Sequence, residues 1–186
     1  SFERRQYGLL KMKNREFYLL ADFVYENFGI KVSDSKMNIF EMKISKLMKS
    51  AGVNSVEEYY TLLKLAKDKK LLTDLLNEVT INKTDFFREI NHFNFIRDNV
   101  EDIMKKNRRI DIHKEIRVWS SACSSGEEPY TIAMILREYL PPQITIKILA
   151  TDISQRVLNI AVKGRYKAIV KTQVPPVFLS KYFVKK

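Results

Sequence analysis

Residues 117–130 read RVWSSACSSGEEPY, and their pattern indicates the architecture of the second half of the chain. Its first four residues predict a short β-strand, and small side chains follow as far as Gly126. Pro129 then stands where a helix can begin, because proline is tolerated in the first helical turn. The stretch therefore predicts a strand, a loop of small residues and a helix that runs to about Leu140.

A second strand and a second helix are predicted in residues 144–162. Residues 144–150 read ITIKILA, with β-branched residues at alternate positions, which indicates a strand. Ser154 can cap the helix that follows, and Gly164 can end it. Alternating strands and helices are typical of a parallel sheet with helical crossovers. Because two strands cannot bury both faces of such a sheet, we expect further strands after residue 186.

Each of the two predicted strands is followed by residues that suit a cofactor. The loop 121–126 has small side chains, so its backbone N–H groups can approach a ligand. It has a single glycine and is not a GxGxxG fingerprint, so a simple tight turn is the competing interpretation. Asp152 follows the second strand, where open α/β folds hold the hydroxyls of an adenosine ribose. Asp152 can equally cap the helix opened by Ser154, and the pattern alone leaves both roles open.

The first eighty residues show helical periodicity and no strand pattern. Phe17, Leu20 and Val24 illustrate the spacing that places apolar side chains on one helical face. The predicted helices cover residues 14–28, 33–50, a third segment that begins at the Ser55 capping box, and 71–79. We therefore expect a four-helix domain over residues 1–80 and an α/β domain over residues 81–186.

Residues 82–89, NKTDFFRE, join the two predicted domains. Thr84 can cap a longer helix that we expect over residues 85–106. Arg88 can present its forked guanidinium group to a carboxylate. A surface ion pair of Arg88 with Glu89 or Asp85 is the competing interpretation.

The formal net charge of +11 raises the question of nucleic-acid binding. Most of the excess lies in residues 163–186, which contain seven Lys or Arg and no Asp or Glu. This charge is spread along a terminal segment and does not mark a recognition helix, so a solvated face is the favoured interpretation. We expect no nucleic-acid partner.

Cysteine and histidine usage excludes several other kinds of site. The single cysteine, Cys123, cannot form an internal disulfide and fits a reducing compartment. We expect Cys123 to be a packed residue and not a nucleophile, and Trp119 to be a core residue. His92 and His113 lack metal-ligand spacing, so we expect no metal site. Without a long apolar run or a charged leader, the chain is predicted to be cytoplasmic and not inserted in a membrane.

Three motifs, taken together and in order, resemble one protein family. They are NxTxFFRE at 82–89, RVWSxACSxGEEPY[ST]IA at 117–133, and ATDIS with GRY at 150–166. They are similar to the chemotaxis receptor glutamate O-methyltransferases, the CheR family. Residues 14–80 look like the N-terminal helical domain of that family. The resemblance implies an α+α/β fold, with a four-helix domain followed by the first half of a class I, Rossmann-like, S-adenosylmethionine-dependent methyltransferase domain.

The resemblance also implies a cofactor and the residues that bind it. S-adenosylmethionine would contact five residues and leave as S-adenosylhomocysteine; they are Asn82, Thr84, Arg88, Glu128 and Asp152. Of the adjacent glutamates, Glu128 is favoured over Glu127, and Arg88 is the expected catalytic residue. Members of the family continue with a small β-subdomain and further strands. We therefore expect the methyltransferase domain to be incomplete in these 186 residues, which alone can be inactive.

The expected substrate is a helical, acidic segment of a methyl-accepting chemotaxis receptor. Four lysines of the second predicted helix can face it, namely Lys36, Lys43, Lys46 and Lys49. The competing interpretation is a solvated lysine face. We expect a monomeric enzyme. The alternative is a non-catalytic module that binds receptor helices or senses the cofactor.

Overall fold

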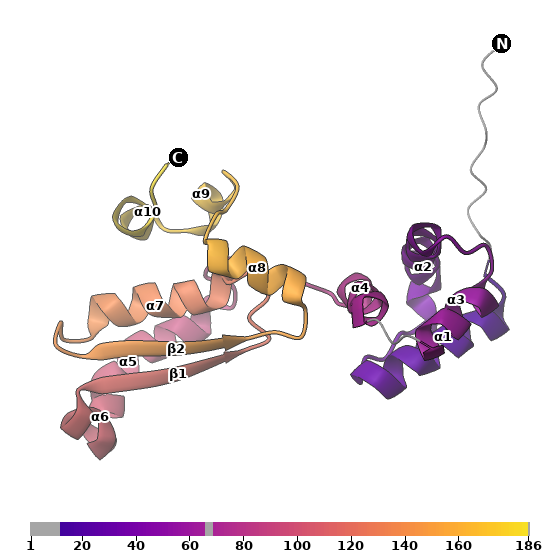
Figure 1. The fold of residues 1–186 in the computed structure, drawn as a ribbon. Coiled ribbons are helices and arrows are strands. Elements are labelled where there is room, and N and C mark those ends of the chain that lie inside the picture. Colours follow the sequence, from indigo (N-terminus) through magenta and orange to yellow (C-terminus); the bar gives the residue numbers. More distant parts are fainter. Residues whose placement is uncertain (1–11, 66–68, 186) are drawn as a thin grey trace, which may run out of the picture. The chain divides into compact units, whose positions relative to one another are not determined.

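The computed structural model describes residues 12–65 and 69–185, and the chain divides into two compact units (Figure 1). The first unit comprises Ser1–Ile81 and the second Asn82–Lys186. In their described parts, no helix is both long and apolar enough to cross a membrane, and no group of three or more His, Cys, Asp or Glu side chains is arranged to hold a metal ion.

The first unit is entirely helical within its described residues. Its elements are α1 (Asn14–Phe28), the 3-10 helix η1 (Asp34–Lys36), α2 (Met37–Ala51), α3 (Val56–Leu65) and α4 (Lys69–Val79). Gly29 and Gly52 end α1 and α2 in the left-handed conformation that glycine adopts without strain. Ser55 Oγ accepts the Glu58 N–H at 3.2 Å, which is the capping bond that the sequence predicts for α3.

One apolar core holds the first unit together. Helices α1 to α4 each contribute an apolar face, and fully buried side chains include Phe17, Leu20, Ile44, Tyr59 and Leu75. The prediction for residues 14–28 matches α1, whereas the helix predicted from residue 33 begins as η1 and becomes α-helical at Met37.

The second unit is built on a strand–helix–strand motif (Figure 1). Its elements are α5 (Ile90–Lys106), α6 (Arg108–His113), β1 (Glu115–Ser121), α7 (Glu127–Tyr139), β2 (Thr145–Thr151), α8 (Gln155–Lys163), α9 (Val170–Gln173) and α10 (Pro176–Tyr182). The two strands pair in parallel, from Glu115 opposite Thr145 to Ser121 opposite Thr151. The predicted parallel βαβ arrangement is therefore present, with α7 as its crossover.

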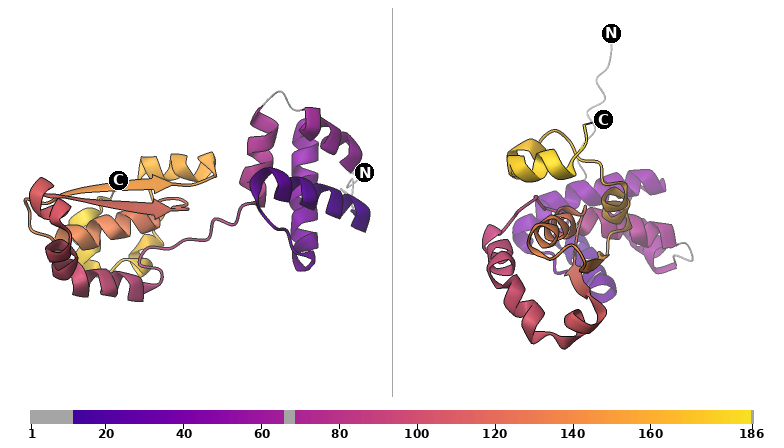
Figure 2. Two further views of the ribbon diagram at one scale, coloured as in Figure 1. Left: turned by 90° about the horizontal axis from the view of Figure 1, so that it is seen from below. Right: turned by 90° about the vertical axis from the view of Figure 1, so that its left-hand side faces the viewer.

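The two faces of the β1–β2 pair differ in burial. Helices α5 and α7 lie on the same face (Figure 2), where they pack against Ile116, Val118, Ile146 and Ile148. On the other face Trp119 is 67% exposed and Leu149 is 62% exposed. The prediction of Trp119 as a core residue is therefore wrong for this structure. The described residues leave its side of the sheet open, and its indole N–H donates to Thr151 Oγ1 at 2.9 Å.

The predicted helix over residues 85–106 is shorter than expected. Helix α5 begins only at Ile90, and Phe87 and Glu89 before it have positive φ values of 55° and 54°. The backbone turns here because the Phe87 N–H donates to Oγ1 of Thr131, a residue distant in the sequence, at 3.2 Å. A long-range hydrogen bond thus outweighs the helical pattern of the local sequence. Helices α6, α9 and α10 were not predicted.

Candidate functional site

The loop after β1 has an unusual backbone. Ala122, Ser124 and Gly126 all have positive φ, at 58°, 50° and 100°. For a residue other than glycine this conformation costs about 1–3 kcal/mol, so surrounding contacts must hold it. One such contact is with the end of β2: the Cys123 N–H donates to the Thr151 carbonyl at 2.9 Å. Strain of this kind is concentrated at ligand sites.

Asp152 bridges the loops that follow the two strands. Its Oδ2 accepts the Ser124 N–H at 2.8 Å, and its Oδ1 accepts the Ser154 N–H at 2.8 Å. Ser154 is the N-cap residue of α8, so the carboxylate of Asp152 stabilises the start of this helix. Through Ser124 it also holds the loop after β1 in place. A carboxylate has about four acceptor positions, so these two bonds leave capacity for ligand hydroxyl groups.

Asn82 joins this cluster through its backbone. Ser124 is buried, and its hydroxyl donates to the Asn82 carbonyl at 3.4 Å. The structure thus brings Asn82 and Asp152 together on either side of Ser124. Thr84, two residues along the same segment, is half-buried.

Both glutamates of the first turn of α7 are tied to the loop region. Glu128 Oε1 accepts from the hydroxyl of Ser120, a buried residue of β1, at 2.7 Å. Glu127 Oε2 accepts from the hydroxyl of Ser125, also at 2.7 Å. These contacts place both carboxylates beside the small-residue loop and do not choose between them as ligands for a cofactor.

Arg88 remains on its own segment. Its side chain is exposed, and Nη1 donates to the Lys83 carbonyl at 2.8 Å. Asp85 is one of the two carboxylates considered as a surface ion-pair partner of Arg88. It instead accepts a hydrogen bond from Gln173 Nε2 at 2.5 Å. The guanidinium of Arg88 therefore folds back over residues 82–89, and the described contacts do not join it to Asp152 or Glu128.

Tyr166 is a residue near this site to which sequence reasoning gave no role. Its hydroxyl donates to the Ser125 carbonyl at 2.8 Å, and burial raises its pKa, so it stays protonated. Its ring packs edge-on against Phe86, with centroids 4.8 Å apart. A Cβ atom on Gly126 would lie 2.8 Å from the Tyr166 hydroxyl and 2.9 Å from Ala161 Cβ, and the φ of Gly126 is +100°, so this position requires glycine. The GRY motif at 164–166 was the available signal.

Cys123 lies inside the same loop and is buried, as predicted. Burial is the main cause that raises the pKa of its thiol, and the neighbouring Asp152 carboxylate adds to the effect. A thiol with a raised pKa has little thiolate at neutral pH, so Cys123 is unsuited to be a nucleophile.

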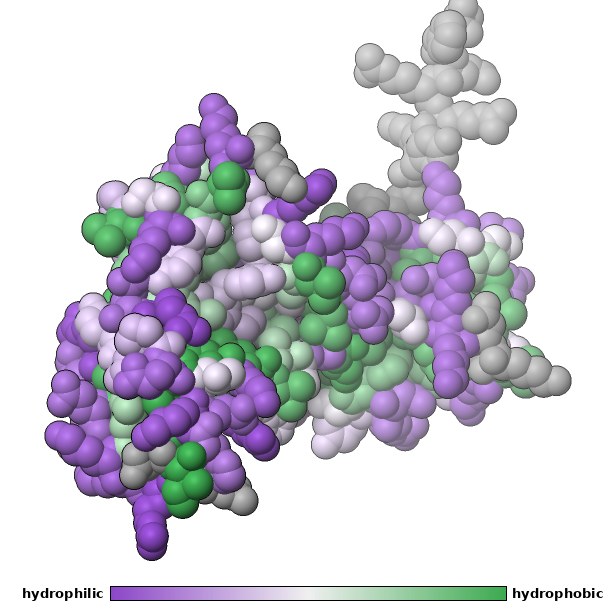
Figure 3. Space-filling view, turned by 60° about the vertical axis from the view of Figure 1, so that its left-hand side comes forward, coloured by the Kyte–Doolittle hydropathy of each residue, from purple (hydrophilic) through white to green (hydrophobic). Residues whose placement is uncertain are grey.

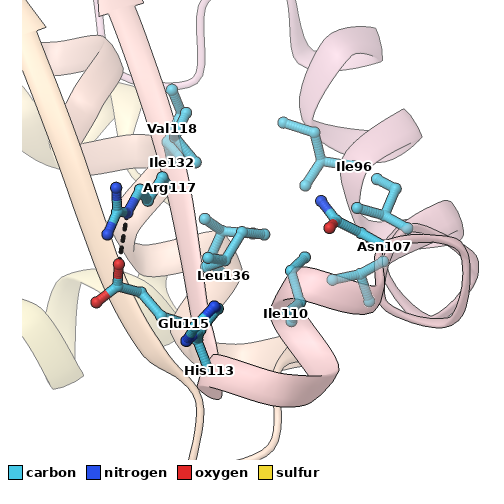
Figure 4. A pocket seen from close by; sticks show the side chains of 12 residues that line it. Ile96, Asn107, Ile110, His113, Glu115, Arg117, Val118, Ile132 and Leu136 are labelled. Carbon is cyan, nitrogen blue, oxygen red and sulfur yellow. Dashed lines mark hydrogen bonds and ion pairs between the residues drawn. The ribbon is translucent and has the colours of Figure 1, made fainter.

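A cavity of about 640 Å³ lies elsewhere in the second unit, between α5 and α6 on one side and β1 and α7 on the other (Figure 4). Its lining is mainly aliphatic and includes Ile96, Ile110, Val118, Ile132 and Leu136. None of the five predicted cofactor residues lines it. In space-filling view, hydrophobic surface remains open between hydrophilic side chains (Figure 3).

The arrangement at the strand ends fits an adenosyl cofactor. Parallel strands, a crossover helix and a carboxylate after the second strand form the kind of site where open α/β domains hold a ribose. The fit is supported by the acceptor positions that Asp152 keeps beyond its bonds to the Ser124 and Ser154 N–H groups. These features define the second unit as an α/β domain of the nucleotide-cofactor-binding class.

Comparison with known families identifies the chain more closely. Residues 82–186 match the SAM-binding domain of CheR methyltransferases, and residues 15–80 match the all-alpha domain of the same family. The chain belongs to the CheR methyltransferase family, whose SAM-binding domain has S-adenosylmethionine as its cofactor.

Curated relatives carry matching names. A chemotaxis protein methyltransferase of Borreliella burgdorferi is 41% identical over 154 residues, which is 81% of this chain and 54% of the relative. Chemotaxis protein methyltransferase 2 of Vibrio cholerae is 32% identical over 90% of this chain and 58% of its own length. The Escherichia coli chemotaxis protein methyltransferase is 31% identical over 95% of this chain and 59% of its own length. The chain thus spans less than two thirds of each of these relatives.

Proposed function

We propose that the protein transfers a methyl group from S-adenosylmethionine to glutamate side chains of methyl-accepting chemotaxis receptors. The observation that carries the proposal is the hydrogen-bonded cluster of Asn82, Ser124 and Asp152 in a chain of the CheR methyltransferase family. In this proposal the protein acts as a monomer in the cytoplasm and has no nucleic-acid partner.

Five residues would hold the cofactor, and each lies in a segment that meets at the strand ends. Asp152 would accept hydrogen bonds from the ribose hydroxyls through its remaining acceptor positions. The rest of the cofactor would lie against Asn82, Thr84, Arg88 and Glu128.

The proposed reaction requires the carboxylate and the methyl group to be positioned, and it requires no proton transfer. A glutamate carboxylate is already ionised at neutral pH, so no general base is needed. When bound, S-adenosylmethionine would supply a sulfonium methyl group, and transfer of that methyl from sulfur to a carboxylate oxygen would give a methyl ester and S-adenosylhomocysteine. The protein would align the carboxylate with the bond between that methyl and sulfur. Nη1 of Arg88 donates to the Lys83 carbonyl, and the other N–H groups of its guanidinium would orient the carboxylate through charge-assisted hydrogen bonds.

Cofactor binding gives the first test. In the full-length protein, Asp152→Asn should raise the Kd for S-adenosylhomocysteine by about tenfold or more in calorimetry, because it removes charged hydrogen bonds to the ribose. Asn159→Asp, an opposite change on exposed α8, serves as the control and should leave the Kd unchanged. Absence of cofactor binding by the unaltered protein would reject the proposed function.

Turnover gives the second test. Arg88→Ala in the full-length enzyme should lower receptor methylation by at least about tenfold, because the substrate carboxylate loses its orienting cation. Fold stability should change little, since Arg88 is exposed. Arg137→Ala, at another exposed arginine, on α7, is the matched control. Unchanged methylation in Arg88→Ala would remove Arg88 from the mechanism.

The receptor is proposed to dock on α2. Lys46 and Lys49 are exposed on α2 and Lys43 is half-buried there, whereas Lys36 is exposed at the end of η1, directly before α2. Lys46 Nζ forms an ion pair with Glu78 at 2.7 Å, with 67% of the lysine side chain exposed. Opposite charge across such an interface supplies encounter rate and register.

A charge-reversal pair tests this docking face. Lys43→Glu with Lys46→Glu should raise the KM for receptor at low salt and leave the Kd for S-adenosylhomocysteine unchanged. Lys105→Glu with Lys106→Glu makes the same charge change on exposed positions of α5 and is the control. Equal receptor KM values for the two double variants would reject α2 as the docking face.

A further inference from the structure

The site segment Asn82–Glu89 adopts a conformation that its own sequence does not favour. It carries Asn82, Thr84 and Arg88, three of the five residues assigned to the cofactor. Its last part turns through positive φ at Phe87 and Glu89, where a regular helix would satisfy the local pattern. A segment in this state stays in place only when neighbouring residues hold its backbone.

Thr131 holds the segment from α7. This residue is fully buried, and its Oγ1 accepts the Phe87 N–H at 3.2 Å while its O–H donates to the Glu127 carbonyl at 2.7 Å. The same hydroxyl therefore connects the turned backbone to the helical turn that carries Glu128. Valine would fill nearly the same volume but would leave the Phe87 N–H without this acceptor.

Gln173 holds the segment from α9. Its Nε2 donates to Asp85 Oδ1 at 2.5 Å, and its Oε1 accepts the Phe86 N–H at 3.4 Å. Phe86 is itself buried in a cluster with Met134, Val170 and Val174. Consecutive backbone amides, those of Phe86 and Phe87, are thus bound by side chains 87 and 44 residues away in the chain.

We propose that Thr131 and Gln173 are positioning residues of the cofactor site. They hold Asn82–Glu89 in its turned form before the ligand arrives, so that Asn82, Thr84 and Arg88 need not be ordered by binding. Preorganisation of this kind strengthens binding by removing an ordering cost. The inference rests on the proposed function for the identity of the ligand.

Thr131→Val and Thr131→Ser form the first test in the full-length protein. Thr131→Val should speed amide hydrogen exchange in residues 84–88 by about tenfold, with the rest of α7 still protected, and should raise the Kd for S-adenosylhomocysteine by about tenfold. Thr131→Ser keeps the hydroxyl and should stay within about twofold of the unaltered protein in both measurements. Unchanged exchange in Thr131→Val, or equal Kd values for the two variants, would overturn the inference.

Gln173→Glu provides an independent variant that keeps the side-chain shape. It places a carboxylate opposite Asp85 and should raise the KM for S-adenosylmethionine by about fivefold or more, because like charges repel at this distance. Adding Asp85→Asn restores an amide–carboxylate pair with the roles exchanged, and should return the KM to within about twofold. A KM that is unchanged in Gln173→Glu, or one that stays raised in the double variant, would contradict the role given to Gln173.

The failure of the proposed function and the failure of this inference give different results. If the unaltered protein does not bind S-adenosylhomocysteine, the proposed function fails, and the exchange rates of residues 84–88 still decide whether Thr131 holds the segment. If the unaltered protein binds and Thr131→Val binds equally well, the positioning role fails and the proposed function stands.

Discussion

The two units of the chain differ in how completely they bury their apolar surface. In the first unit, α1 to α4 direct their apolar faces into one core, and residues such as Phe17 and Ile44 are wholly buried. In the second unit, α5 and α7 cover one face of the sheet, while Trp119 and Leu149 on the other face remain largely exposed. An amphipathic helix has one face to bury, whereas a parallel sheet has two. The helical unit is therefore closed within the described residues, and the α/β unit is not.

The largest expected effect lies in the closed core. Ile44→Ala should lower the free energy of unfolding by about 2–5 kcal/mol, because it opens a cavity at a fully buried position. Ile39→Ala on the same helix, where the side chain is 57% exposed, should cost less than about 1 kcal/mol. Calorimetric melting of the two variants measures the contrast, and similar losses would show that the core is not where the structure puts it.

A glycine pair compares crowding in the two units. Gly126→Ala should cost about 2–4 kcal/mol, because its Cβ would lie 2.9 Å from Ala161 Cβ and its φ is +100°. Gly52→Ala in the first unit has a similar backbone but open space, so it should cost only about 1 kcal/mol. Urea unfolding of both variants gives the difference, and equal costs would mean that Tyr166 and Ala161 do not press on the loop.

The smallest expected effect is a gain. Tyr59 is fully buried in the first unit, and its hydroxyl has no hydrogen-bond partner within the described part of the chain. Burial also raises its pKa. Tyr59→Phe should therefore raise the free energy of unfolding by about 1 kcal/mol, because an unsatisfied polar group is removed from the core. Tyr60→Phe, at a half-buried neighbour, should change little, and a loss in Tyr59→Phe would point to a partner for the hydroxyl.

Local patterns predicted the α-helices of the first unit, apart from the 3-10 start before α2, and the strands of the second unit. Helical spacing in residues 14–28 predicted α1 because burial and pattern agree there. The same spacing failed at Phe87, where the amide pairs with a side chain 44 residues away. Helices α9 and α10 are short and carry weak patterns, and Val170 and Val174 are buried against residues distant in sequence. Contacts between distant segments are not readable from local periodicity.

The sequence predicted that Asp152 and the loop after β1 lie at the strand ends, but it did not predict the hydrogen bonds between them. Asp152 and the small-residue loop stand at the strand ends, as the pattern indicated, but the bond from Ser124 N–H to Asp152 needed the fold. Both roles weighed for Asp152 remain compatible with the structure, because it supports the start of α8 and keeps acceptor capacity. The sequence did not predict a role for Tyr166, because its hydrogen bond to the Ser125 carbonyl joins positions 41 residues apart.

The division of the chain after Ile81 has a kinetic consequence. If the two units act on the same receptor, as proposed, the covalent connection between Ile81 and Asn82 would give an effective concentration on the order of millimolar. Under the proposed function, weak and quickly reversible receptor binding by the first unit would be enough to supply the second, and turnover would not be limited by slow release of a tightly bound receptor. Lengthening the connection after Ile81 with flexible residues would reduce that local enrichment and leave each module intact.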